Sequence, residues 1–214
     1  MNKTIHKVFI VAISVIFLGI GVSIALKVDV GVGAWDALSQ SISRVINIKV
    51  GTIAMMLNIS CVLIQLLLLK KEFKIKHVLQ ILVAILLGIV VNFILYEVLS
   101  NFTVNNYFIK ILLLLVAYII CAISVSVIMA INFVSLPLEG CCIVISARIN
   151  KKFGTLRQVV DIISIIIALS ISLIFNQRLP VREGTIIGMI IFGPMLDFFM
   201  KIMMPTLKKL DLVD

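Results

Sequence analysis

Six long apolar runs are the feature that most limits how this chain can fold. They cover residues 8–28, 51–69, 77–99, 108–131, 155–175 and 184–204. A helix needs roughly 20 apolar residues to cross the hydrocarbon core of a bilayer. The chain is 62% hydrophobic and only 14% charged, whereas soluble domains are roughly 25% charged. We therefore predict an all-α membrane protein with six transmembrane helices in one membrane domain, residues 1–214.

Two of the connections between runs are polar hinges that each lead into a short helix. The first hinge contains Asp29, Gly31 and Gly33, and its glycines favour a flexible turn. The amphipathic segment 35–46 follows it, beginning with Trp35 and Asp36. This segment is too short and too polar to span a bilayer, so it either lies at the interface or re-enters the membrane.

The second half of the chain repeats these features. The second hinge starts at Asn132, and the short segment 139–150 starts at Glu139. At an offset of 103 residues, Asp29 aligns with Asn132, Asp36 with Glu139, Asn58 with Asp161, and Gly51-Thr52 with Gly154-Thr155; at an offset of 105, Asn92 aligns with Asp197. Apolar runs align easily by chance, but ordered polar positions do not. We predict two three-helix repeats, residues 1–107 and 108–214.

The distribution of Lys and Arg predicts the orientation. With both termini inside, the inner segments hold twelve basic residues and the outer segments hold six. The outer six are Lys27, Arg44, Lys49, Lys110, Arg178 and Arg182. By the positive-inside rule this predicts cytoplasmic termini in a multi-pass protein. Because each repeat has three spans, the two repeats are inverted relative to each other, as in many transporters.

Five polar residues inside the spans are candidates for substrate binding or coupling. Arg157 and Asp161 lie one helical turn apart, which fits a structural ion pair, a solute or proton site, or side chains that extend to the lipid headgroups. Asp197 fits either a carboxylate at the membrane interface or a second member of the Asp161 cavity. For Asn58 and Asn92, hydrogen bonds between helices are the simpler role.

The residues that begin the hinges and short helices have a simpler explanation as well. A carboxylate at Asp36 or Glu139 stabilises a helix N-terminus by about 0.3–1 kcal/mol. Gly184 and Gly188 have the spacing of a helix-packing face.

The sequence argues against several classes of function. The two histidines, His6 and His77, lie at the ends of apolar runs, and Cys141 and Cys142 are adjacent rather than in a CxxC pair, so we expect no metal site. No hydrolase, metalloprotease or phosphate-binding motif occurs, so we expect no catalytic residues, no cofactor and no enzyme activity. The net charge of +9 comes mainly from short connections and indicates lipid headgroups rather than nucleic acid.

The chain resembles the YczE/YyaS/YitT family of bacterial membrane proteins. The residues that carry the resemblance are Val28-Asp29-Val30-Gly31-Val32-Gly33-Ala34-Trp35-Asp36, Gly51-Thr52, Gly154-Thr155-Leu156-Arg157 with Asp161, Glu183-Gly184-Thr185, and Gly193-Pro194-Met195-Leu196-Asp197. The chain departs from that pattern with Asp161 where Glu is expected and with few glycines in the second hinge. The resemblance implies a polytopic inner-membrane protein without naming a substrate.

We expect a secondary transporter or exporter of a small, unknown solute. A channel-like pore and a membrane scaffold or accessory subunit of a larger complex are the alternatives. The expected partners are the lipid bilayer, the solute, and either a second copy of the chain or another membrane protein.

Overall fold

The computed structural model describes residues 3–209 and 212, and this part of the chain is entirely helical apart from its connections. Its α-helices are α1 (Lys3–Val28), α2 (Ala34–Ile46), α3 (Val50–Leu69), α4 (Ile75–Phe93), α5 (Tyr107–Ile131), α6 (Pro137–Arg148), α7 (Phe153–Ile174) and α8 (Glu183–Lys209). A 3₁₀ turn, η1 (Lys70–Glu72), follows α3, and a π turn, η2 (Ile94–Val98), extends α4.

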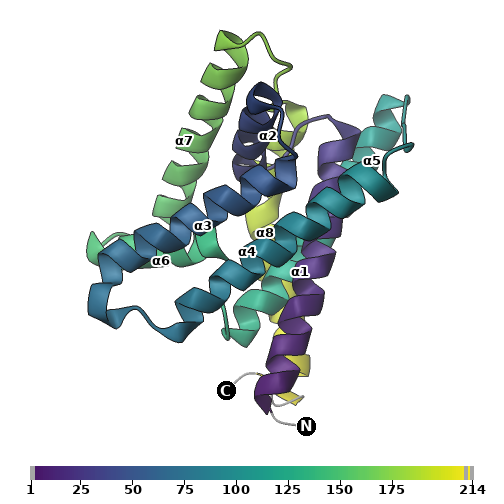
Figure 1. The fold of residues 1–214 in the computed structure, drawn as a ribbon. Helices are drawn as coiled ribbons and strands as arrows, with labels where there is room; N and C mark the ends of the chain where they lie inside the picture. Colours follow the sequence, from purple (N-terminus) through teal and green to yellow (C-terminus); the bar gives the residue numbers. More distant parts are fainter. Residues whose placement is uncertain (1–2, 210–211, 213–214) are drawn as a thin grey trace.

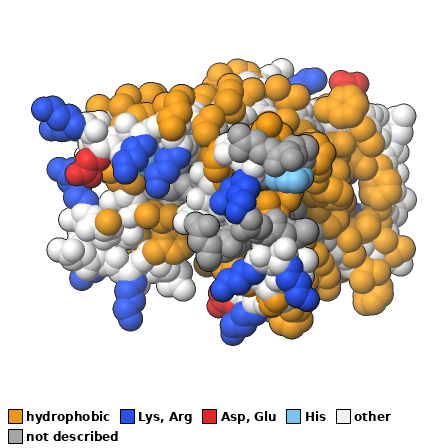
Figure 2. All heavy atoms as spheres, turned by 90° about the horizontal axis from the view of Figure 1, so that it is seen from below, with side chains coloured by type: hydrophobic (Ala, Val, Ile, Leu, Met, Phe, Trp, Pro, Cys, Tyr) orange, Lys and Arg blue, Asp and Glu red, His pale blue; other side chains and the backbone are white. Residues whose placement is uncertain are grey.

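Six of these helices are long and apolar enough to cross a membrane, which confirms the predicted spans. They are α1, α3 with η1, α4 with η2, α5, α7 and α8. The chain is a multi-pass membrane protein. The start of α1 and the end of α8 lie at the same end of the molecule (Figure 1). Lys and Arg side chains gather on that end, seen from below in Figure 2.

The two central helices are α1 and α5, which pack along each other. Most of the remaining helix contacts occur twice, once for each half of the chain. α4 packs on α1 as α8 packs on α5. Likewise α3 packs on α6 as α7 packs on α2, and α2 contacts α3 as α6 contacts α7. Two pairings have no comparable counterpart. α4 contacts α6, whereas any contact between α8 and α2 is marginal. The α3–α4 contact is extensive, whereas α7 and α8 touch each other marginally at most.

Helix ends repeat between the two halves of the chain. Six non-glycine residues within the described part have positive φ angles, between 48° and 55°, and all follow or end a helix. They form three pairs: Asp29 with Asn132, Asn47 with Asn150, and Lys70 with Asn176. Asn is the residue that most readily adopts this conformation after glycine, which explains why four of the six are Asn.

The last helix is longer than predicted. We expected the final span to end at residue 204 and a charged tail to begin at Pro205, but α8 continues to Lys209. Pro205 removes a backbone donor, yet the extra turn places Leu207 in the core beside Val11 and Ile128. This burial offsets the loss of one helical hydrogen bond.

The first hinge is packed against the start of α8, where we expected a flexible turn. The Gly184 amide donates to the Val30 carbonyl at 2.8 Å, and both Val30 and Val32 are buried. Gly31 has a φ of 109°, and a Cβ there would lie 2.7 Å from the Thr185 amide nitrogen, so only glycine fits.

Candidate functional site

The two short helices begin beside each other in the middle of the fold. Trp35 in the first turn of α2 packs into a buried cluster with Leu138, the second residue of α6. Cys61, Cys141 and Cys142 complete the buried part of this cluster. Pro137 starts α6 with its φ already suited to a helix. The third residue of each short helix, Asp36 on α2 and Glu139 on α6, therefore lies next to this cluster.

Arg157 of α7 is the positive centre of the site. Its Nε lies 3.8 Å from Oε1 of Glu139, and its Nη1 pairs with Oδ1 of Asp161. The three side chains are 27%, 18% and 24% exposed, so water screens the group only in part. The predicted Arg157–Asp161 pair is therefore present, and α6 adds a second carboxylate to it.

Asp36 is a fourth charged member of this group, which we call the charged cluster. Its carboxyl group interacts electrostatically with Arg157, Asp161 and Glu139. Asp36 lies in α2, outside the six spans, and burial raises its pKa to about 6, while Arg157 partly opposes that shift. Asp161 and Glu139 raise the pKa further because they are negative.

The charged cluster has three carboxylates for one guanidinium. When all four groups are ionised it carries a charge of −2, and the N-terminal ends of α2 and α6 offset only part of this. A group with these properties can take up a proton near neutral pH or attract a cation. Among residues 3–209 and 212, no three His, Cys, Asp or Glu side chains are arranged to hold a metal ion.

Asn92 and Asn58 have separate places in the first repeat. Asn92 accepts from the Gly51 amide at 2.9 Å and donates to the Thr52 hydroxyl at 2.9 Å, so it joins α4 to the start of α3. Asn58 is buried on α3.

Asp197 lies apart from the charged cluster. It is exposed on α8 and borders a surface pocket of about 560 Å³ whose other lining residues are also on α8. The structure thus brings Asp161 together with Glu139 and Asp36, and it gives Asp197 different neighbours.

The hinge residues divide between the two ends of the fold. Asp29 accepts ion pairs from Arg178 at 2.6 Å and from Arg44 at 3.4 Å. Gly33 is the N-cap of α2, and a Cβ there would lie 3.2 Å from Oδ2 of Asp36. Asn132 ends α5 in the left-handed conformation.

The structure contains a buried hydrogen-bond network of two glutamine side chains that the sequence did not lead us to predict. Gln65 donates to the Gln80 carbonyl oxygen at 2.8 Å and to the Pro137 carbonyl at 3.2 Å, and Gln80 donates to the Ser135 hydroxyl at 3.0 Å. This network ties α3 and α4 to the second hinge, directly before α6. The available signal was the occurrence of two glutamines within predicted spans, since uncharged amides there require partners.

Comparisons with known proteins agree with the resemblance seen in the sequence. Residues 5–201 match the family described as "Family of unknown function (DUF6198)". The chain is also 20% identical over 190 residues to the "Uncharacterized protein YyaS" of Bacillus subtilis (strain 168), covering 89% of this chain and 90% of that protein. No solved structure matches the chain.

Proposed function

The chain belongs to the DUF6198 family of unknown function, and we propose that it is a secondary transporter or exporter of a small solute in the bacterial cell membrane. One observation carries this proposal. Glu139 of α6 pairs with Arg157, and Asp36 of α2 interacts electrostatically with the same arginine, although the two short helices belong to different halves of this six-span chain. Transporters commonly place solute and coupling-ion sites where two repeats and their interrupted helices meet.

Shared backbone and hydrogen-bond details support the two-repeat arrangement. The three pairs of residues with positive φ recur at offsets of 103 or 106 residues. Ser23 of α1 donates to the Val91 carbonyl of α4, and Ser126 of α5 donates to the Leu196 carbonyl of α8. The donors are 103 residues apart and the acceptors 105, the two offsets seen in the sequence.

The two repeats differ in a way that suits alternating access. Gly51 and Gly88 face each other where α3 crosses α4, since a Cβ on Gly51 would lie 2.4 Å from the Gly88 carbonyl oxygen. Their counterparts, Gly154 and Gly193, have no atoms near the corresponding positions. We propose that the second conformation closes α7 onto α8 and opens α3 from α4, so that the charged cluster faces the other side of the membrane.

In this mechanism Asp36 and Asp161 are the proton or cation acceptors, and Arg157 sets their affinity. A carboxyl group with a pKa near 6, such as that of Asp36, exchanges protons readily in the physiological range. When Asp36 or Asp161 is neutralised, Arg157 is released toward Glu139 or toward an anionic part of the solute. The coupling is thus a competition of carboxylates for one guanidinium.

The proposed orientation has both termini in the cytoplasm. Basic side chains gather on the end that carries the start of α1 and the end of α8 (Figure 2). With this orientation the first hinge faces outward, the second hinge faces inward, and α2 and α6 enter the protein from opposite sides.

Proton flux in proteoliposomes tests the transport proposal. Vesicles containing the purified protein and the pH dye pyranine are given an outward proton gradient, and tetramethylammonium, putrescine or ethidium is then added outside. We expect at least one of these cations to collapse the gradient through the wild-type protein, because the charged cluster is negative. Asp36→Asn and Asp161→Asn should abolish this flux.

Glu97→Gln is the matched control, because Glu97 is an exposed carboxylate outside the cluster. It should transport at the wild-type rate. Flux that persists in both cluster variants would overturn the proposed mechanism. Flux that never saturates with cation concentration would instead favour the channel-like pore.

The alternative role as a scaffold or accessory subunit is favoured by one observation. The marginal contact between α7 and α8 leaves long apolar faces on both helices, which another membrane protein or a second copy could cover. Co-purification of a stoichiometric partner, together with absence of flux for every cation, would support that role.

A further inference from the structure

Basic residues predicted on the outer side gather at one place in the structure. Five of the six surround the first hinge: Lys27, Arg44, Lys110, Arg178 and Arg182. The sixth, Lys49, pairs with Glu97 instead. The positive-inside rule disfavours positive charge on this side of the membrane. The clustering of these five cations on that side therefore indicates a specific local role for them.

A single carboxylate organises the group. Asp29 receives Arg178 at 2.6 Å on Oδ2 and Arg44 at 3.4 Å on Oδ1. The Arg182 guanidinium donates to the Asp29 backbone carbonyl at 2.9 Å and also pairs with Glu183 at 3.6 Å. Asp29 and Glu183 supply two negative charges against the five positive charges of the group, which leaves an excess of three positive charges.

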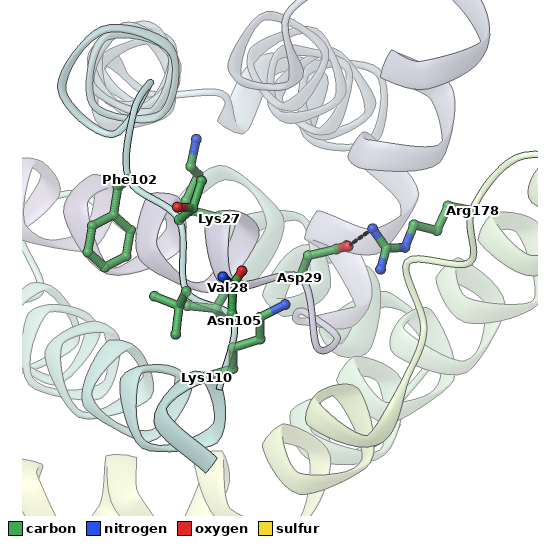
Figure 3. Close-up of a pocket in the computed structure, with 9 residues that line it drawn as sticks. Lys27, Val28, Asp29, Phe102, Asn105, Lys110 and Arg178 are labelled. Carbon is green, nitrogen blue, oxygen red and sulfur yellow. Dashed lines mark ion pairs between the residues drawn. The ribbon is translucent and has the colours of Figure 1, made fainter. Parts of the chain in front are cut away.

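A pocket of about 280 Å³ opens beside Asp29 (Figure 3). Lys27 at the end of α1, Lys110 at the start of α5 and Arg178 contribute three cations to its lining against the single charge of Asp29. The Lys27 ammonium donates to the Ser100 carbonyl at 3.0 Å. Lys110 is half-buried, its ammonium group has no hydrogen bond or ion pair within the described part of the chain, and its side chain extends toward Asp29 in Figure 3.

We propose that this pocket is a binding site for an anionic phosphate group. A half-buried ammonium without a partner is unfavourable unless an anion joins it. The Arg178 guanidinium and the Lys110 ammonium on either side of Asp29 match the charge and the several oxygens of a phosphate, and Lys27 adds a third positive charge to the pocket lining. Asp29 holds Arg178 in place and competes with the incoming anion for it.

The phosphate has two sources with the same chemistry. The pocket lies where α1 ends and α5 begins, the depth at which lipid headgroups are found, so a phospholipid can supply it. A phosphorylated or inorganic solute outside the cell can supply it as well. This site is separate from the charged cluster, and the inference does not rest on transport.

Binding measurements with two probes distinguish the sources. Inorganic phosphate is titrated into the detergent-purified protein and followed by thermal unfolding, with sodium chloride at equal ionic strength as reference. Phosphatidylglycerol is offered in nanodiscs, against phosphatidylcholine, and its retention is read by native mass spectrometry. Saturable stabilisation by phosphate identifies a soluble anion, and selective retention of one phosphatidylglycerol identifies a lipid; either result supports the site.

Variants tie the binding to the pocket. Lys110→Gln and Arg178→Gln should each raise the Kd by about tenfold, because each removes one charge-assisted contact. Lys49→Gln removes a cation from the same end of the protein but outside the pocket, and should leave the Kd unchanged. Asp29→Asn keeps a residue that tolerates the left-handed backbone and removes the competing carboxylate, so binding should tighten.

Three results would overturn the inference. The first is absence of saturable binding with both probes. The second is equal weakening in Lys49→Gln and Lys110→Gln, which would indicate general charge attraction. The third is weaker binding in Asp29→Asn although the variant unfolds at the wild-type temperature.

Discussion

At the scale of single residues, charge pairing explains how this apolar protein holds its few ionised groups. Arg157 forms ion pairs with two carboxylates, and Asp29 forms ion pairs with two arginines. One site therefore has excess negative charge and the other excess positive charge. Both are half-buried, where removing one partner leaves the others insufficiently compensated.

Arg157→Gln should destabilise the protein. Breaking a buried pair costs roughly 3–5 kcal/mol, and partial exposure of this group lowers the expected loss to about 1–3 kcal/mol. Arg157→Lys should restore part of the loss, since it keeps the charge without the planar fork. Thermal unfolding in detergent measures both. Arg148→Gln, which removes an exposed arginine from the Leu68 carbonyl, is the control and should change stability by about 0.5 kcal/mol or less.

Asp36 should make stability depend on pH. Its pKa is about 6 in the folded protein and 3.8 as the ordinary value, so the folded state holds the proton more tightly than the unfolded chain. The stability that Asp36 contributes is therefore present below about pH 4 and is lost as pH rises through about 6. Unfolding of wild type and Asp36→Asn across this range should diverge, with the wild type losing more stability as pH rises. Parallel curves would contradict the raised pKa.

At the scale of helices, small residues set how closely each pair can approach. The α3–α4 crossing depends on Gly51 and Gly88, because any Cβ at either position meets the other's backbone oxygen within 2.6 Å. The α5–α8 contact uses Gly188, where a Cβ would lie 2.7 Å from the Tyr118 hydroxyl. The sequence indicated a packing face at Gly184 and Gly188, but it did not indicate which helix they would meet.

Gly51→Ala and Gly154→Ala form a matched pair at equivalent positions of the two repeats. Gly51→Ala should destabilise by about 2 kcal/mol, since overpacking a tight contact costs roughly 1–3 kcal/mol. Gly154 has open space around it, so Gly154→Ala should be neutral or stabilise by up to about 1 kcal/mol through helix propensity. Unfolding of the two variants in the same detergent compares them. Equal losses would mean that α7 and α8 pack as closely as α3 and α4.

At the scale of the whole molecule, the proposed inverted arrangement gives the two repeats opposite orientations across the membrane. Lys49 and Lys152 precede α3 and α7, occupy equivalent positions at the 103-residue offset, and are exposed. In the inverted arrangement they face opposite sides.

Cysteine labelling in intact cells tests this arrangement. In a background without the four native cysteines, Lys49→Cys should react with a membrane-impermeant maleimide added outside. Lys152→Cys should react only after the cells are permeabilised. Labelling of both positions from one side would contradict the inverted repeat.

The sequence by itself determined the spans, the two hinges and the short helices after them. A span needs about 20 apolar residues because of the thickness of the bilayer. A hinge is marked by glycine, Asn or Asp. Both features can be recognised from a short stretch of sequence. The end of α8 was missed because only the core shows that Leu207 is buried.

Only the tertiary structure decided which polar residues meet. Asp36 and Arg157 come from opposite halves of the chain, and so do Asp29 and Arg178. Their encounters depend on how α2 packs against α7 and how the first hinge docks on α8. No local pattern encodes such crossings, because each one results from the balance of many apolar contacts and the few small residues that let backbones approach.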